Sequence, residues 1–237
     1  LAGEWFCGDL PQAVVASRGI FGAAAGPWSG GTGAALLMNA AIDPEPSADR
    51  PRAWLAFDAR AGTASEELFV VDVAMRTQRV LRLTPDDGVP SKYPDVAVAG
   101  DRAALTWFDV EDGNEEVYVA LVARAALAHG RIDKPMRVTS TPGASIGAYL
   151  AWNGDRLGLA WSDDSLGQHE VFLQVFDASG RAAAEPVRLT NTRSSSLIPA
   201  IEAAGNGFAL AWGQFDAAAG DGHGEGGRSQ IAFTLTP

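Results

Sequence analysis

The chain has a single cysteine, Cys7, so it cannot form an internal disulfide. It has no run approaching 18 consecutive apolar residues, which argues against a membrane span. Lys and Arg number only 18 against 29 Asp and Glu, and the net charge is −11. Nucleic acids and anionic membrane surfaces are bound through clusters of Lys and Arg, so we expect neither as a partner.

Helical periodicity is also lacking, since no segment repeats apolar residues every 3.6 positions over a helical length. The Ala-rich stretches 22–27 and 123–130 are short and flanked by glycine. Hydrophobic residues at 47% and charged residues at 20% are typical of a soluble globular protein. The chain begins at Leu1 without the charged and apolar regions of a signal peptide, so we expect a processed or trimmed product.

What the chain does contain is a repeat of about 50 residues, visible in three landmarks that keep the same order. An apolar run ends at Phe57, Trp107, Trp161 and Trp212. An acidic residue opens a β-rich run at Glu67, Glu116 and Glu170. An Arg-Leu/Val-Thr triplet follows at 82–84, 137–139 and 188–190. The common period predicts repeated structural units.

Each unit divides into four short strands, a to d. In the third unit these strands are 146–152, 156–161, 169–176 and 185–191, and Asn153-Gly154-Asp155 forms a tight turn between the first two. Strand b alternates large with small residues, as in Leu157-Gly158-Leu159-Ala160-Trp161. Such a strand is buried on both faces, because bulky side chains of one sheet settle against small ones of the next. Stacked four-stranded units of this length predict an all-β fold, a β-propeller.

The stretches YPDVAVAGDRAALTW (93–107), NEEVY (114–118) and LIPAIEAAGNGFALAW (197–212) resemble the TolB-type, WD40-like propeller repeats of bacterial envelope and secreted proteins. The similarity covers about residues 50–237 and implies an extracytoplasmic protein: periplasmic, secreted or at the cell surface. The a–b turn departs from that pattern because it lacks Ser-Pro-Asp-Gly. The Asp-box of sialidases, Ser-x-Asp-x-Gly-x-Thr-Trp, is absent.

Four blades are the favoured count, preceded by an N-terminal segment at 1–32. The predicted blades span about 33–85, 86–140, 141–191 and 192–237. The last unit ends at its strand c, and an open edge would expose unpaired backbone groups. We therefore expect residues 11–19 to pair beside 229–236 and close the last blade. The alternatives are five blades, with 4–9 and Trp28 in a degenerate one, or a partial arc of a larger propeller.

The b–c and d–a loops of a propeller emerge on one face, and here that face is acidic and rich in hydroxyl groups. Its candidate binding residues are Lys92, Asp109, Glu111, Asp112, Asp163, Asp164, His169, Arg193 and Trp28. We interpret Trp107, Trp161 and Trp212 as core residues instead, because each ends a buried strand. The repeated Glu and Arg residues are predicted to be structural cross-strand partners.

One candidate metal site is present. Asp221, His223 and Glu225 alternate with glycines, so an extended chain would project all three to one side toward a divalent cation such as Ca²⁺. The other interpretation is a glycine-rich surface loop. Asp109, Glu111 and Asp112 offer oxygen ligands too, although capping of the hairpin turn is the favoured role. We expect no other cofactor.

The favoured function is a non-catalytic binding scaffold for a protein partner in a bacterial envelope or extracellular assembly, because loops of variable length extend from regular strands. A lectin-like, glycan-binding propeller is the first alternative. A propeller hydrolase or lyase is the second; it would need convergent carboxylates and a histidine with perturbed pKa values at the mouth of the central channel. The three histidines lie in separate loops and no nucleophile elbow is present, so catalysis is not the leading expectation.

Overall fold

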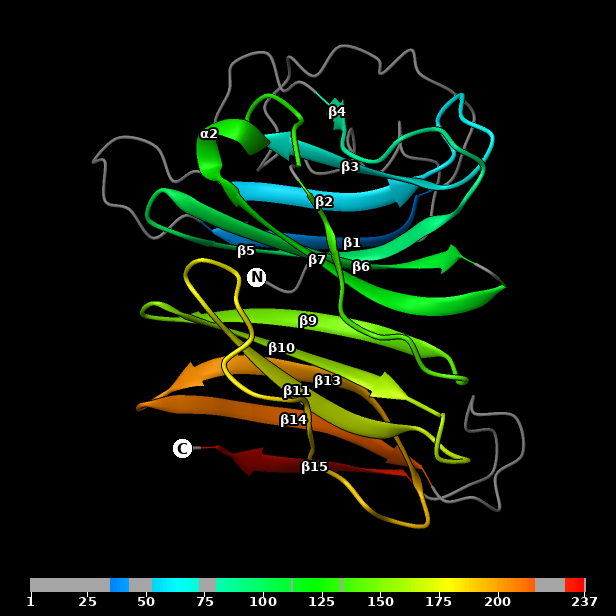
Figure 1. Cartoon of the computed structure of the whole chain (residues 1–237), viewed down its shortest axis with the longest axis vertical. Helices are drawn as coiled ribbons and strands as arrows, with labels where there is room; N and C mark the ends of the chain where they lie inside the picture. The colour runs from blue at the N-terminus through cyan, green and yellow to red at the C-terminus, as the bar shows by residue number, and fades with distance from the viewer. Residues whose placement is uncertain are drawn as a thin grey trace. The chain divides into compact units, whose positions relative to one another are not determined.

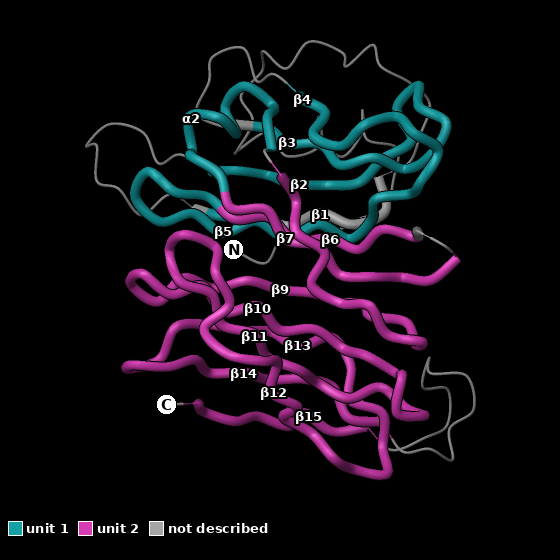
Figure 2. Tube along the Cα trace, in the orientation of Figure 1, with its two compact units in different colours: residues 1–103, 122–133 teal, residues 104–121, 134–237 magenta. Residues whose placement is uncertain are grey.

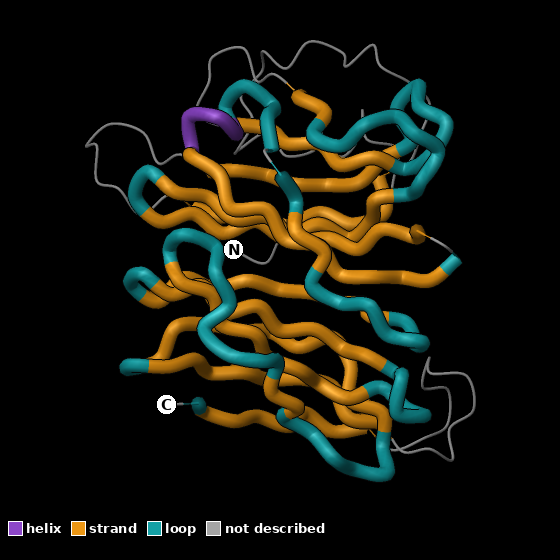
Figure 3. Tube along the Cα trace, viewed as in Figure 1, coloured by secondary structure: helices purple, strands orange, loops and turns teal. Residues whose placement is uncertain are grey.

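The computed structural model describes residues 35–42, 53–72, 80–111, 113–132, 134–215 and 229–236. In this part of the chain all regular structure is β, apart from one short helix, α2 (Arg124–Leu127), within the Ala-rich stretch 123–130 (Figure 3). None of these residues forms a helix of the length and apolarity needed to cross a membrane.

The strands form four antiparallel sheets, one for each repeat unit (Figure 1). Within each sheet the strands are hydrogen-bonded in chain order. Sheet 1 contains β1 (Ala35–Ile42), β2 (Ala53–Ala59), β3 (Glu67–Asp72) and β4 (Val80–Arg82). Sheet 2 contains β5 (Ser91–Ala99), β6 (Arg102–Glu111), β7 (Asn114–Ala123) and β8 (Met136–Arg137). Sheet 3 contains β9 (Ser145–Asn153), β10 (Arg156–Asp163), β11 (Glu170–Asp177) and β12 (Val187–Arg188). Sheet 4 contains β13 (Ser195–Ala204), β14 (Gly207–Phe215) and β15 (Ser229–Leu235).

Sheet 4 has three strands among the described residues, as expected for a unit that ends at strand c. The predicted closing strand at 11–19 lies outside the described residues. So do residues 4–9 and Trp28, which the five-blade alternative used. The closing strand therefore stays a prediction, and five blades stay an alternative.

The chain divides into two compact units (Figure 2). Unit 1 comprises residues 1–103 and 122–133, and unit 2 comprises residues 104–121 and 134–237. Sheet 1, β5 and α2 belong to unit 1, whereas sheets 3 and 4 belong to unit 2. This division runs through β6 and β7 of sheet 2 and therefore differs from the four repeat units.

The core of unit 2 shows why the strands alternate large and small residues. Ile201, Phe208, Leu210 and Trp212 of sheet 4 form one buried cluster with residues of sheet 3 that include Ala151 and Ala160. A Cβ atom added at Gly158 would lie 2.8 Å from both Ile201 Cδ1 and Phe208 Cε1. Bulky side chains of one sheet thus fill the space that small residues of the next leave open.

The aromatic residues that end each strand b are buried, which confirms the prediction of a core role. Trp107, Trp161 and Trp212 expose 1%, 2% and 8% of their surface. In three sheets the ring stacks on an aromatic residue across the strand pair. The stacked pairs are Phe57–Phe69, Trp107–Tyr118 and Trp161–Phe172, with ring centroids 5.6, 5.9 and 5.8 Å apart. Such pairs pin the register of strands b and c.

Candidate functional site

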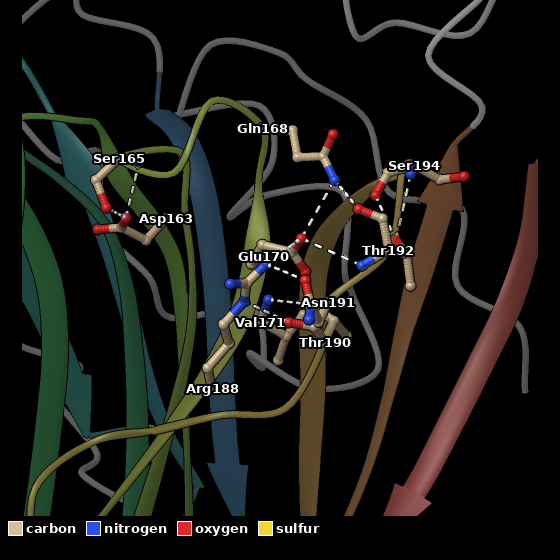
Figure 4. Close-up of polar contacts among 10 residues, drawn as sticks. All are labelled: Asp163, Ser165, Gln168, Glu170, Val171, Arg188, Thr190, Asn191, Thr192 and Ser194. Atoms are coloured by element: carbon tan, nitrogen blue, oxygen red, sulfur yellow. Dashed lines mark hydrogen bonds and ion pairs between the residues drawn. The ribbon is translucent and has the colours of Figure 1, made fainter.

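A buried carboxylate network lies at the start of strand c of sheet 3, where the sequence predicts a structural cross-strand pair (Figure 4). Glu170 is fully buried, and its carboxylate accepts hydrogen bonds from Thr190 Oγ1 and, at 2.8 Å, from Arg188 Nη2. Gln168 Nε2 donates to the same carboxylate at 3.2 Å. Burial raises the pKa of Glu170, but the bonds from Thr190, Arg188 and Gln168 outweigh it and leave that pKa below its ordinary value.

The same network recurs in sheet 2. Thr139 Oγ1 donates to Glu116 Oε2 at 2.5 Å, and Arg137 Nη2 lies 3.1 Å from Glu116 Oε1. The threonine hydroxyl also accepts the backbone N–H that follows the glutamate. The predicted cross-strand Glu–Arg pairs are therefore confirmed in sheets 2 and 3, where they join strands c and d.

Sheet 1 departs from this pattern, and the predicted pairing of Glu67 with Arg82 is wrong. Among the described residues no ion pair joins them; Arg82 Nη1 instead lies 3.9 Å from Asp86 Oδ2. Ser65 Oγ donates to Glu67 Oε1 at 2.7 Å, the oxygen that arginine holds in the other sheets. Burial, together with the negative charges of Asp87 and Asp86, raises the pKa of Glu67 above its ordinary value despite hydrogen bonds from Thr84 and Ser65.

Asp163, a predicted binding residue, is committed to a second structural network. It is 2% exposed and accepts hydrogen bonds from Thr141 Oγ1 and Ser145 Oγ at 2.8 and 2.7 Å. Its other oxygen accepts the backbone N–H of Ser165 at 2.9 Å (Figure 4). Burial raises the pKa of Asp163, yet these bonds lower it more. The network fastens the β10–β11 loop to the loop before β9.

The remaining predicted residues do not converge. Asp109 accepts the indole N–H of Trp107 at 2.8 Å within β6. Asp164 accepts the backbone N–H of Ala144 at 2.7 Å and so joins the β10–β11 loop to the residue before β9. His169 is half-buried and Arg193 is exposed. Nothing is described of the Glu111 side chain. Asp112, Trp28, Asp221, His223 and Glu225 lie outside the described residues. Within the described part of the chain, no group of three Asp, Glu, His or Cys residues is placed to hold a metal ion.

A different set of residues departs from the repeat, and all of it lies in unit 1. Asp58 follows the aromatic residue of strand b, where the other sheets have Phe108, Ser162 and Gly213. Lys92 and Tyr93 on β5 stand where β9 and β13 have Ile146-Gly147 and Leu197-Ile198. Arg60 and Glu66 flank the β2–β3 loop. We call Asp58, Arg60, Glu66, Lys92 and Tyr93 the β2–β5 site.

Two backbone hydrogen bonds hold β5 against the end of sheet 1. The N–H of Tyr93 donates to Asp58 Oδ1 at 3.2 Å, and the N–H of Ser91 donates to the carbonyl of Glu66 at 2.8 Å. Tyr93 has a φ of 54°, in the left-handed region that glycine favours. Tyr93 is 40% exposed as a residue, whereas Asp58 is fully buried. A buried carboxylate thus helps to hold a strained backbone that presents an aromatic ring.

Glu66 is the partly accessible carboxylate of this site. Arg60 Nη2 lies 3.2 Å from Glu66 Oε2, and the Glu66 side chain is 18% exposed. Partial burial raises the pKa of Glu66, but its backbone hydrogen bond and the positive charges of Lys92 and Arg60 outweigh that effect and lower the pKa. Glu66 is therefore ionised at neutral pH. The site combines a carboxylate, two cations and an aromatic face.

Of these five residues, only Lys92 is among the binding residues predicted from the sequence. The features shared by the repeat units do not point to Asp58, Arg60, Glu66 or Tyr93. The signal in the sequence for Asp58 and Tyr93 is a polar residue at a position that is apolar or small in the other units.

A shallow cavity of about 310 Å³ lies elsewhere in unit 1, lined by Trp54, Asp101, Ala123, Arg124, Ala125 and Ala128. It lies at the start of β2, the opposite end of that strand from Asp58. Three of its lining residues are alanines. Its aromatic residue, Trp54, is fully buried, whereas Tyr93 of the β2–β5 site is exposed.

Comparison with solved structures identifies the fold of the chain. No family model and no curated protein sequence matches the chain. Solved structures do match, among them the endosialidase of phage phi92, with a TM-score of 0.58, 9% identity and coverage of 85% of this chain. The GH93 α-L-arabinofuranosidase of Fusarium graminearum in complex with arabinobiose has a TM-score of 0.57, with 10% identity over 85% of this chain. The chain has a β-propeller fold.

A subtype N10 neuraminidase-like protein of A/little yellow-shouldered bat/Guatemala/060/2010 also matches, with a TM-score of 0.51 and 11% identity over 81% of this chain. The chain spans 57% of that protein, 62% of the arabinofuranosidase and 35% of the endosialidase, less than two thirds of each. The predicted propeller is confirmed. These neighbours are glycosidase and neuraminidase-like propellers and lend no support to the TolB-type resemblance.

Proposed function

We propose that this propeller acts on glycans as a glycoside hydrolase and that the β2–β5 site contacts the sugar. The observation that carries the proposal is that Asp58, Lys92 and Tyr93 replace apolar or small residues of the repeat, beside an ionised Glu66. An exposed aromatic face stacks on the C–H face of a sugar ring, while carboxylates and cations bind its hydroxyl groups.

The structural neighbours support this proposal at the level of fold, since two that resemble the chain are an endosialidase and an arabinofuranosidase. Fold alone is a weak guide to function, so the residues of the site must carry the chemistry. Glycoside hydrolysis uses two carboxyl groups beside the scissile bond. We assign to Glu66 the ionised carboxylate of this pair, which acts as base or nucleophile. The proton for the leaving oxygen must come from a second carboxyl group that is not among the five residues of the site. Asp58 is a positioning residue, because it is buried and bonded to the backbone of Tyr93.

Glu67 is not the partner acid, although its pKa is raised and it adjoins Glu66 in sequence. Glu66 precedes β3 and pairs with Arg60, whereas Glu67 is the first residue of that strand and bonds to Ser65. Glu67 is also fully buried and bonded to Thr84 and Ser65. It belongs to the structural network that recurs at Glu116 and Glu170.

Sugar release from defined oligosaccharides tests the proposal. The protein is incubated with arabino-oligosaccharides and sialo-oligosaccharides, and products are separated by anion-exchange chromatography. We expect Glu66→Gln to lower turnover by about 10²–10⁴-fold, the contribution of a positioned acid or base. Tyr93→Ala should weaken binding. Glu202→Gln is the matched control, since Glu202 is an exposed carboxylate on β13. Binding without release would leave a lectin-like role, and neither binding nor release would refute the proposal.

The protein-binding scaffold predicted from the sequence is the second candidate, and one observation favours it. Ile231, Phe233 and Leu235 on β15 expose 76%, 78% and 69% of their surface. Exposed apolar side chains in a row suit contact with another protein. An extracytoplasmic location stays part of both proposals, because glycan substrates and envelope partners are found there.

A further inference from the structure

One backbone position of the repeat adopts a left-handed conformation in three sheets. It lies two residues after a buried serine, at Tyr93 on β5, Gly147 on β9 and Ile198 on β13. The φ angles are 54°, 61° and 54°. In sheets 3 and 4 the pairing of strands a and b shifts register there, which marks a β-bulge.

Glycine fits this conformation without strain, whereas a β-branched residue such as isoleucine is a rare outlier in it. Gly147 shows that the repeat accepts glycine here. Packing does not compensate at Ile198, because its side chain is 61% exposed. The N–H of Ile198 donates to Ser162 Oγ at 3.1 Å, but a glycine would donate the same bond. The fold therefore gives no reason for the isoleucine side chain.

Strained residues that the fold does not need are characteristic of binding sites. We infer that this bulge is a ligand-contact position built into the repeat, and that Ile198 presents an apolar surface to the C–H face of a bound sugar. Gly147 of β9 adjoins it: a Cβ added there would be in van der Waals contact with the backbone of Ile198, 3.7 Å from its Cα. Leu166 is a second exposed apolar residue, with 57% of its surface accessible. It lies in the loop after β10, and Ile198 bonds to Ser162 near the end of that same strand. The assignment of the ligand class depends on the proposed function.

The test compares stability with binding in Ile198→Gly. Because the substitution removes backbone strain and little buried surface, we expect a melting temperature that is unchanged or raised by about 2–4 °C. Binding of arabinobiose or a sialo-oligosaccharide, whichever the unaltered protein binds more tightly, should weaken by about 5–10-fold, as expected when an aliphatic contact is lost. Isothermal titration calorimetry measures the affinity. Val187→Ala is the matched control, since Val187 is 54% exposed on β12 with ordinary strand geometry, and it should leave affinity unchanged.

A lower melting temperature with unaltered affinity would mean that Ile198 is structural, and the inference would be overturned. Unaltered affinity in Ile198→Gly alongside weakened binding in Tyr93→Ala would overturn it too, while the proposed function survived. If the unaltered protein binds neither sugar, the proposed function fails and the ligand assigned to Ile198 fails with it.

Discussion

The pair Glu170–Arg188 offers a quantitative test of the buried network. The cycle combines Glu170→Gln with Arg188→Met, which keeps the aliphatic stem but removes the charge. Exposed ion pairs couple by about 0.2–1 kcal/mol, and removing one partner of a buried pair costs about 3–5 kcal/mol. Glu170 is fully buried and the Arg188 side chain is 33% exposed, with 2.8 Å between Nη2 and Oε1. This intermediate burial predicts a coupling energy of about 1–2 kcal/mol.

The chain supplies its own control at the same repeat position. Glu67 and Arg82 occupy the corresponding positions of the motif but form no ion pair with each other, so Glu67→Gln and Arg82→Met should couple by less than about 0.3 kcal/mol. Urea unfolding followed by tryptophan fluorescence at pH 7 measures both cycles. Equal coupling in the two pairs, or none at Glu170–Arg188, would show that the repeated glutamate does not depend on its arginine.

Two further predictions follow from packing and from protonation. Gly158→Ala should destabilise the fold by about 1–3 kcal/mol, because its Cβ would lie 2.8 Å from Ile201 and Phe208. Gly154→Ala, with φ +60° and open space around it, should cost only about 1 kcal/mol in the same denaturant assay. Equal costs would argue against the packing of sheet 4 side chains onto small residues of sheet 3. The raised pKa of Glu67 means that the folded state binds its proton more tightly than the unfolded chain, so the stability from this group is complete below pH 4.5 and is lost as pH rises toward the folded pKa. The melting temperature of Glu67→Gln relative to the unaltered protein should therefore rise between pH 4 and pH 7 in calorimetry, and a falling difference would contradict the assignment.

Most of the fold could be predicted because the repeat encodes it three times over. In sheet 3 the strands expected at 146–152 and 156–161 correspond to β9 and β10 within two residues. Strand d was predicted too long: 185–191 was expected, but β12 spans only Val187–Arg188. Two residues suffice because Leu189 and Thr190 bond to Val171 without a continuing ladder. An apolar pattern cannot reveal where backbone pairing stops and side-chain bonding takes over.

The candidate site was harder to predict, because acidic residues on the loop face fall into two chemical classes that look alike in sequence. Glu116, Asp163 and Glu170 are buried and bonded by threonine, serine or arginine donors. Glu66 keeps part of its surface accessible. The number of acidic residues in the sequence does not separate the two classes. A structural carboxylate differs from an accessible one in its hydrogen-bond donors, which lie about 20 residues away in the sequence.

Sheet 1 differs from the other sheets both in its buried glutamate network and at a residue of the β2–β5 site. Its repeated glutamate lacks the arginine that neutralises it elsewhere, and Asp86 and Asp87 add negative charge beside Glu67. On the same sheet Asp58 replaces an uncharged residue and bonds to the strained backbone of Tyr93. Each change gives up stability that the regular repeat would retain, as binding sites commonly do. Because sheet 1 lacks the ion pair of sheets 2 and 3 and its Asp58 bonds to the backbone of an exposed tyrosine, we propose that a ligand binds there.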